Sequence, residues 1–422
     1  MPRIYAIDFG TSNSLICAAN EKRVFDPIPI DPTATDPTVM RSLFFFPSAS
    51  KVFYGNEALR EFQEEGQGRL IRSIKKHLPM RSFIGTYIDN RPINLEDLIG
   101  LFLETMRKRA NEHFQKEVDS VVLGRPARFH EDDATDRFAE GRLEIAAKKA
   151  GFKHIEFFQE PTAAACEFKS TLKDKKNVLV ADFGGGTSDF TILKMDNGPF
   201  KPEDVLAIGG VSLAGDVLDG AVMRKRISKH FGADAKFQLP FSTNILSMPK
   251  HLIEKICSPA DLSLLLKREV RDYLSRVEQF AFKKEDKESI ERLFILIENQ
   301  LGFPIFESIE HAKRDLSEQP ATKMLFDYPG IKIAEEISKT QFESYIQPDV
   351  SKIIACLDET LKTSGLNASQ IDVICCTGGT ARVPLIQAEL INRFGKEKVT
   401  EYNRFHSVVK GLAERARELV AS

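Results

Sequence analysis

Two short segments of the chain carry residue types that can bind phosphate groups and metal ions. The first, IDFGTSNS, covers residues 7–14, and the second, ADFGGGTSDF, covers residues 181–190. In each segment an apolar run ends at an aspartate, Asp8 or Asp182, which is followed by Phe-Gly and by hydroxyl-bearing residues. Backbone N–H groups of a glycine turn can approach an anion closely, and Thr and Ser hydroxyls add further donors. The pattern therefore indicates phosphate binding.

The aspartates fit this chemistry only if a cation lies between them and the phosphates, because like charges repel. Mg²⁺ keeps much of its hydration shell in proteins, so Asp8 and Asp182 could orient its water molecules. The competing interpretation is two tight hairpins, each with a capping aspartate. The duplication favours two turns that hold the phosphates of one nucleotide between two lobes. Neither segment is a Walker A loop or a G-x-G-x-x-G fingerprint that opens a helix.

The elements that position these turns follow from hydrophobic periodicity. Each turn lies between two apolar runs, which predicts a strand–turn–strand hairpin rather than a strand-to-helix junction. Apolar residues at three- and four-residue spacing predict helices at residues 95–114 and 131–152, the second ending at Gly151. A strand is predicted within residues 120–129, a mostly helical region at 233–305, a strand, glycine turn and helix at 365–390, and a last helix at 407–420. Strands that alternate with helices indicate an α/β architecture, here duplicated.

Composition excludes several classes of protein. A chain of 422 residues predicts two domains or lobes. Lys and Arg (59) nearly balance Asp and Glu (61), so we expect no nucleic-acid or membrane partner. The N-terminus lacks a secretory signal pattern, and no apolar run approaches the ~20 residues that cross a bilayer. The six cysteines form no C-x-x-C pair and no zinc spacing. Cys375 and Cys376 end the apolar run IDVICC, so we expect buried thiols there, and we expect a reducing, cytoplasmic compartment.

The chain resembles the ATPase domain of the 70-kDa heat-shock chaperones, within the actin, sugar-kinase and chaperone superfamily. The resemblance covers nearly the whole chain and rests on the two glycine turns and on five further motifs: SLFFFPS…YGNEAL (42–59), SIKKHL (73–78), QEPTAAA (159–165), SIEHAKRDLS (308–317) and CTGGTARVPLI (376–386). It is strongest to short YegD-type chaperones that lack a peptide-binding domain, and we expect none here. It implies an α/β, two-lobed actin-like ATPase fold, built from duplicated ribonuclease H-like domains around a central nucleotide cleft. The expected lobes are residues 1–175 and 176–422, with 233–305 as a variable helical subdomain.

The resemblance also implies ATP or ADP and Mg²⁺ as ligands, and it implies roles for individual residues. Asp8 and Asp182 would organise the water shell of the metal, and Lys75, Glu160, Thr187 and Asp182 would form the catalytic group. Lys75 would neutralise charge on the transferred phosphoryl group, and Glu160 would lie near the attacking water. The phosphates would be held by Gly10, Thr11, Ser12, Asn13, Gly184, Gly185, Gly186 and Thr187. The adenosine would be held by Glu310, Lys313, Arg314, Ser317, Gly378, Gly379 and Arg382.

Several of these residues also have ordinary structural interpretations. Taken alone, Lys75 is an exposed lysine on a solvated face, and Lys76 is a second candidate for its role. Glu160 would be a helix-capping glutamate before Pro161. Glu310 and Arg314 would be a surface ion pair at helical spacing.

The chain departs from the family pattern at a few positions. Phe405 stands where the family has an aspartate near the nucleotide, and Ala214 stands where the family usually has glycine. Pro126 matches a proline that relays between lobes, with Arg137 as a candidate partner at altered spacing. The departures leave nucleotide binding favoured and put the rate of hydrolysis and the signalling between lobes in question.

The function expected from these features is slow ATP hydrolysis that drives opening and closing of the lobes. An unidentified protein partner or co-chaperone would respond to this motion. One alternative is a non-catalytic nucleotide sensor that binds a partner protein. A second is a small-molecule kinase of the same superfamily, and an actin-like filament is weaker still.

Overall fold

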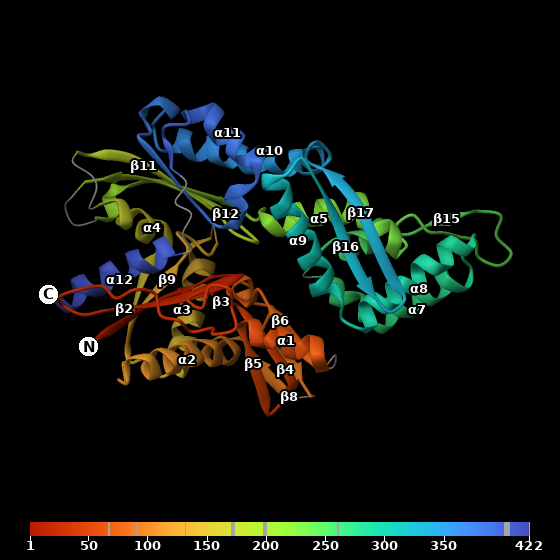
Figure 1. Ribbon diagram of the computed structural model, residues 1–422, viewed down its shortest axis with the longest axis horizontal. Helices are drawn as coiled ribbons and strands as arrows, with labels where there is room; N and C mark the ends of the chain where they lie inside the picture. Colours follow the sequence, from red (N-terminus) through yellow and green to blue (C-terminus); the bar gives the residue numbers. More distant parts are fainter. Residues whose placement is uncertain are drawn as a thin grey trace. The chain divides into compact units, whose positions relative to one another are not determined.

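A computed structural model describes residues 1–65, 68–89, 91–130, 132–169, 174–196, 201–259, 261–400 and 406–421. The chain forms two compact units (Figure 1). Unit 1 comprises residues 1–212, 356–381 and 390–422, and unit 2 comprises residues 213–355 and 382–389. Both units are assembled from separate stretches of the chain, and the predicted lobe boundary at residue 176 stays a prediction.

The first sheet of unit 1 has the strand order β10-β9-β1-β2-β3. Its strands are β1 (Ile4–Phe9), β2 (Asn13–Ala19), β3 (Met40–Arg41), β9 (Ser120–Arg125) and β10 (His154–Gln159). In β1, Tyr5, Ile7 and Phe9 enter one apolar cluster, and Ile4 and Ala6 enter another. Successive side chains of a strand point to opposite faces, so the sheet is buried on both sides. β1 and β2 form the predicted antiparallel hairpin.

Helices cover both faces of this sheet. Helices α2 (Leu95–Phe114) and α3 (Asp133–Lys149) contribute to the cluster that contains Tyr5, and α12 (His406–Ala421) packs against β1, β2 and β9. Helix α2 has its predicted bounds. Helix α3 begins later than predicted because the side chain of Asp132 accepts a hydrogen bond from the Thr135 amide and so caps the helix. The helix is followed by Gly151 in the left-handed region (φ +88°), as predicted.

The second sheet of unit 1 has the order β13-β12-β11-β18-β19. Its strands are β11 (Lys176–Phe183), β12 (Ser188–Met195), β13 (Val205–Val211), β18 (Val373–Thr377) and β19 (Val399–Thr400). β11 and β12 form the second predicted hairpin, and β18 lies parallel to β11. Helix α4 (Glu160–Lys169) joins the two sheets, because Ala163 packs with α12 while Ala164 and Ala165 pack against β11.

Unit 1 also contains a group of short strands, and two further helices include residues of both units. In unit 1, a three-stranded sheet and a hairpin are accompanied by a helix and a single 3₁₀ turn: β4 (Leu43–Ser48), β5 (Lys51–Tyr54), β6 (Arg69–Arg72), β7 (Gly85–Ile88), β8 (Arg91–Asn94), α1 (Gly55–Glu65) and η1 (Ile74–His77). Helices α10 (Lys339–Thr363) and α11 (Pro384–Phe394) each include residues of both units.

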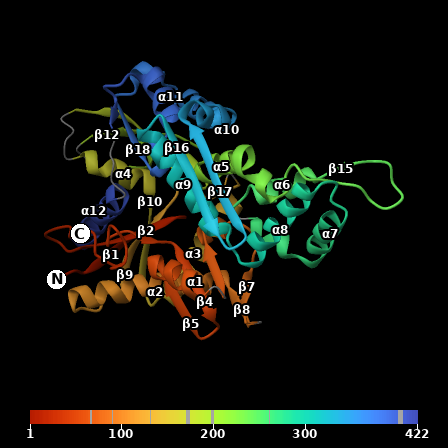
Figure 2. The same cartoon turned by 45° about the vertical axis from the view of Figure 1, so that its right-hand side comes forward.

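Unit 2 is mostly helical, as predicted for residues 233–305. Its elements are α5 (Gly215–Val222), α6 (Lys250–Ile256), α7 (Arg268–Gln279), α8 (Lys284–Glu298), α9 (Gly302–Glu318), and the hairpins β14 (Lys236–Phe237)–β15 (Leu246–Ser247) and β16 (Ala321–Tyr328)–β17 (Ile331–Ser338). Helix α9 packs along β16, and the two lie side by side in both views (Figures 1 and 2). Helix α5 continues into a π-helical turn at Met223–Ile227.

Among the described residues, no helix combines the length and the apolar character needed to cross a bilayer. Cys375 and Cys376, at the end of β18, are buried, as predicted for this apolar run. Cys17 and Cys257 are buried as well.

Candidate active site

The two glycine turns lie in the two sheets of unit 1, each at the end of its first strand. Asp8 pairs in register with Leu15, and Asp182 pairs with Asp189. A side chain at Gly10 would overlap the carbonyl oxygen of Asn13, so this turn requires glycine. The second turn is closed by a hydrogen bond of 2.9 Å from the Gly184 amide to the Thr187 carbonyl. Both hairpins therefore deliver their aspartate to a tight turn, and the first of these turns requires its glycine.

Two buried hydroxyl groups hold the turns at equivalent positions. The Ser42 hydroxyl donates to the Gly10 carbonyl at 2.7 Å, and the Thr380 hydroxyl donates to the Gly184 carbonyl at 2.9 Å. Gly10 and Gly184 are the glycines that follow Asp-Phe in the two motifs. The Ser42 amide also donates to the Ser12 carbonyl at 2.9 Å. Sequence reasoning missed both hydroxyls, although Ser42 and Thr380 each lie within a motif of the family resemblance, because neither motif shows which carbonyl its hydroxyl contacts.

Lys75 lies in the 3₁₀ turn η1 and pairs with Glu160, the first residue of α4. Its Nζ donates to Oε1 of Glu160 at 2.7 Å. The interpretation of Lys75 as an exposed surface lysine is wrong, because the residue is only 8% exposed. Its burial has a physical reason: a charged lysine is tolerated inside a protein when a carboxylate lies beside it. Glu160 is the first residue of α4 and precedes Pro161, which agrees with its interpretation as a glutamate at a helix start. The same side chain also forms the ion pair with Lys75.

The charges of both turns act on this ion pair. Burial, and then Glu160 and Asp182, raise the pKa of Asp8 to about 8, while Lys75 lowers it. Burial also raises the pKa of Asp182, and it raises the pKa of Asp189 to about 7. Burial alone would lower the pKa of Lys75, but Glu160 and Asp8 raise it above its ordinary value. The structure thus brings together Asp8, Lys75, Glu160, Asp182 and Asp189.

This arrangement has more carboxylates than cations, which fits the binding of a hard metal ion. Among the described residues, no three His, Cys, Asp or Glu side chains come together to ligate a metal directly. A metal at this site would therefore take its direct ligands from water and from phosphate oxygens, which is the usual mode of Mg²⁺. Asp8 and Asp182 are the residues that would hold its water ligands. A divalent cation would also offset the repulsion that raises the pKa of Asp8.

The remaining phosphate-site candidates lie on the accessible part of the two turns. Ser12 and Thr187 are exposed, and Thr11, Asn13, Gly185 and Gly186 are half-buried. The Thr187 hydroxyl donates to Asp189 at 2.8 Å. These residues lie on the same turns as Asp8 and Asp182, and their roles toward phosphate stay predictions.

The adenosine-site candidates are divided between the two units. On α9 of unit 2, Arg314 donates to Glu310 at 2.6 Å in an exposed pair, as the surface interpretation predicts. Lys313 instead forms a buried ion pair of 2.7 Å with Asp219 of α5. The Ser317 hydroxyl donates to the Lys313 carbonyl. Gly378 and Gly379 belong to unit 1, and Arg382 belongs to unit 2, so a shared adenosine site stays a prediction.

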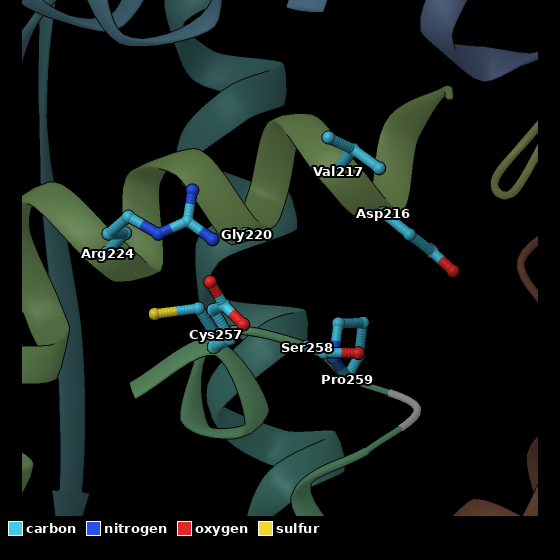
Figure 3. A pocket seen from close by; sticks show the side chains of 8 residues that line it. Asp216, Val217, Gly220, Arg224, Cys257, Ser258 and Pro259 are labelled. Carbon is cyan, nitrogen blue, oxygen red and sulfur yellow. The ribbon is translucent and has the colours of Figure 1, made fainter. Parts of the chain in front are cut away.

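Unit 2 also contains a pocket of about 180 Å³ beside helix α5. Figure 3 shows Asp216, Val217, Gly220 and Arg224 along one wall and residues 257–259 on the facing segment. Burial raises the pKa of the Cys257 thiol to about 11, so this thiol is not a reactive nucleophile at neutral pH. Sequence reasoning did not identify this pocket.

The residues where the sequence departs from the family pattern are only partly described. Phe405 lies outside the described residues. Near Pro126 the observed partner is Arg125, whose Nε donates to the Pro126 carbonyl at 3.1 Å and whose guanidinium pairs with Asp136 at 2.7 Å. A role for Arg137 stays a prediction.

Duplicated Asp-Phe-Gly hairpins that converge on a buried lysine and several carboxylates, in a mixed α/β fold, define the actin-like class of nucleotide-binding proteins. The chain belongs to the Hsp70 family: the family model described as Hsp70 protein matches residues 49–259 and 282–421. This membership confirms the resemblance drawn from the motifs, and the two-lobed actin-like ATPase fold is the fold of that family.

Similar proteins are bacterial chaperones of low sequence identity. The chain is 25% identical over 420 residues to the chaperone protein DnaK of Thermosipho melanesiensis, covering 98% of this chain and 59% of that protein. It is 26% identical over 427 residues to a chaperone protein HscA homolog of Rickettsia akari, covering 98% of this chain and 56% of that protein. The chain thus spans less than two thirds of the length of these relatives.

Proposed function

We propose that the chain binds Mg-ATP and slowly hydrolyses it to ADP and phosphate at the site formed by the two glycine turns of unit 1. The observation that carries this proposal is the buried Lys75–Glu160 pair, which lies within the field of Asp8 and Asp182. Membership of a family of ATPases that use ATP and Mg²⁺ supports the same reaction. The chain spans only part of the length of these relatives, so the activity of the full-length relatives applies to this chain only as part of this proposal.

The residues of the site have distinct tasks in this proposal. Amide and hydroxyl groups of the turns, from Gly10 to Asn13 and from Gly184 to Thr187, hold the β- and γ-phosphates. Lys75 neutralises charge that develops on the transferred phosphoryl group, since catalysis of phosphoryl transfer is mainly positioning and electrostatics. Glu160 accepts a hydrogen bond from the attacking water. When bound, Mg²⁺ supplies positive charge at the phosphates, and Asp8 and Asp182 hold its water ligands.

The proposal extends to the adenosine residues and to a partner. Glu310, Lys313, Arg314, Ser317, Gly378, Gly379 and Arg382 bind the nucleoside, and hydrolysis drives opening and closing of the two lobes. A protein partner or co-chaperone responds to this change. The names of the relatives, DnaK and HscA chaperones, support a chaperone-type partner.

Single-turnover hydrolysis of Mg-ATP, measured with nucleotide affinity on wild type and Asp182→Asn, tests the proposal. Hydrolysis in the wild type that is lost in the variant supports it. Tight binding without hydrolysis in the wild type contradicts the ATPase and identifies a nucleotide sensor. Transfer of phosphate to a sugar instead of water would identify a kinase.

A further inference from the structure

The turn that carries Lys75 is too short to hold its own position. It is a single 3₁₀ turn, Ile74–His77, and such turns have poorer hydrogen-bond geometry than an α-helix. The residue before it, Ser73, has a φ of +53° in the left-handed region, which is uncommon for residues other than glycine. The position of Lys75 therefore depends on contacts with other parts of unit 1.

Arg142 of α3 supplies these contacts. Its guanidinium donates to three main-chain carbonyls that follow Lys75: those of His77 at 3.4 Å, Met80 at 3.3 Å and Phe83 at 3.1 Å. Its Nε donates to Glu96 of α2 at 2.5 Å. Arg142 is only 6% exposed, and a guanidinium offers five donors in a rigid plane, so one side chain ties residues 77–83 to two core helices.

We propose that Arg142 is a positioning residue for Lys75, which it keeps on Glu160 by holding the main chain of residues 77–83. The effect on hydrolysis rests on the proposed function, whereas the effect on the position of the segment does not. Burial of Ile74 and Leu78 also holds the segment, but apolar contacts are non-directional and do not fix a main-chain orientation as the three carbonyl contacts do.

The informative substitution is Arg142→Lys. A lysine keeps the positive charge beside Glu96 but is a point donor that cannot reach three separate carbonyls. The matched control is Arg107→Lys. Arg107 also donates to main-chain carbonyls, of Ala150 at 2.9 Å and Val118 at 3.3 Å, but neither carbonyl belongs to the segment 77–83 that Arg142 contacts.

The pKa of His77, measured by NMR titration, reports the position of the segment without any turnover. Burial, and then the charges of Lys76 and Arg142, lower this pKa from 6.5 to about 4, and the ring stacks on Phe83 at 4.0 Å. We expect Arg142→Lys to raise the pKa toward 6.5, because a loosened segment exposes the ring, and Arg107→Lys to leave it unchanged. An unchanged pKa in Arg142→Lys would overturn the proposal.

Single-turnover hydrolysis then tests whether Arg142 acts through Lys75. We expect Arg142→Lys to lower the rate about tenfold or more with little change in nucleotide affinity, and Arg107→Lys to match the wild type. In a Lys75→Ala background, Arg142→Lys should lower the rate by less than about twofold, because the group it positions is already absent. Equal losses in both backgrounds, or an equal loss in Arg107→Lys, would overturn the proposal. A wild type without hydrolysis would refute the proposed function, and the His77 titration would still decide the role of Arg142.

Discussion

Lys75 and Glu160, separated by 85 positions in the sequence, form an ion pair of 2.7 Å that links η1 to the start of α4. Both side chains are largely buried. Helix α4 lies between the two sheets that carry the glycine turns. The pair therefore connects a lysine that is only 8% exposed to the helix that joins the two sheets.

Lys75→Ala should lower single-turnover hydrolysis by about 10²–10³-fold, as expected for loss of one group that stabilises charge in the transition state. Nucleotide affinity should change much less, because the loss is expected mainly in the transition state. Lys76→Ala is the matched control, because it removes the adjacent lysine and leaves the pair of Lys75 with Glu160 in place. Equal effects of the two substitutions would show that Lys75 has no special role.

The stability of the nucleotide-free protein should depend on pH through Asp8. Burial, and then Glu160 and Asp182, raise its pKa from 3.8 to about 8. Between these values the folded protein holds a proton that the unfolded chain has lost, so stability is highest below pH 4 for this group and is lost as the pH rises through about 8.

Asp8→Asn removes this titration. The melting temperature of Asp8→Asn should therefore rise relative to that of the wild type between pH 5 and pH 9. Asp119→Asn is the control, because a hydrogen bond from Lys153 lowers the pKa of Asp119 and its contribution is constant above pH 5. A difference between Asp8→Asn and wild type that does not vary with pH would contradict the prediction.

Ser42→Ala and Thr380→Val should each weaken nucleotide binding by about three- to tenfold. Each substitution removes a hydrogen bond to a turn glycine, and such bonds contribute about 1 kcal/mol. Calorimetric titration with ADP measures the change. Ser50→Ala, which removes an exposed hydroxyl that contacts Ser48, is the control and should bind like the wild type. Wild-type affinity in both turn variants would show that the hydroxyls do not hold the turns in a binding conformation.

Lys313→Met should destabilise unit 2 by about 3 kcal/mol, because it leaves Asp219 buried without its partner. Burial raises the pKa of Asp219 to about 6 even with Lys313 present, and loss of the lysine raises it further. Below its pKa the carboxyl can stay neutral, so the destabilisation should grow between pH 5 and pH 8.

Arg314→Met is the matched control for this substitution. Its pair with Glu310 is exposed, and such pairs contribute less than about 1 kcal/mol. Urea unfolding followed by circular dichroism measures the change in the free energy of unfolding for both variants. Restoration of stability in the double variant with Asp219→Asn would support the mechanism, and equal losses in Lys313→Met and Arg314→Met would contradict it.

Much of the fold could be predicted from local patterns. The apolar period of α2 extends over the full helix, and the strand–glycine–strand order of both hairpins is encoded within short segments. The observed start of α3, Asp133, differs from the predicted start at residue 131 because a single capping residue, Asp132, determines it. Such a cap changes the boundary of a helix without changing its hydrophobic pattern.

The residues that hold the candidate site in position could not be predicted from local patterns. Ser42 and Arg142 act through hydrogen bonds to carbonyls that lie far from them in the sequence. A carbonyl is present at every residue, so the sequence has no pattern that marks the acceptor. The burial of Lys75 is similar, because it follows from Glu160 and not from the residues around it.

The packing of α12 on β1 has a consequence for the synthesis of the protein. Val409, Leu412 and Ala413 pack in one apolar cluster with Ile4 and Ala6, so this face of β1 lacks part of its cover during synthesis until α12 has been translated. At elongation rates of about 5–20 residues per second this interval is on the order of half a minute. During that time the nascent chain presents a partly covered apolar strand of the kind that makes folding intermediates prone to aggregation, so this member of the Hsp70 family is itself expected to be a client of chaperones while it is being made.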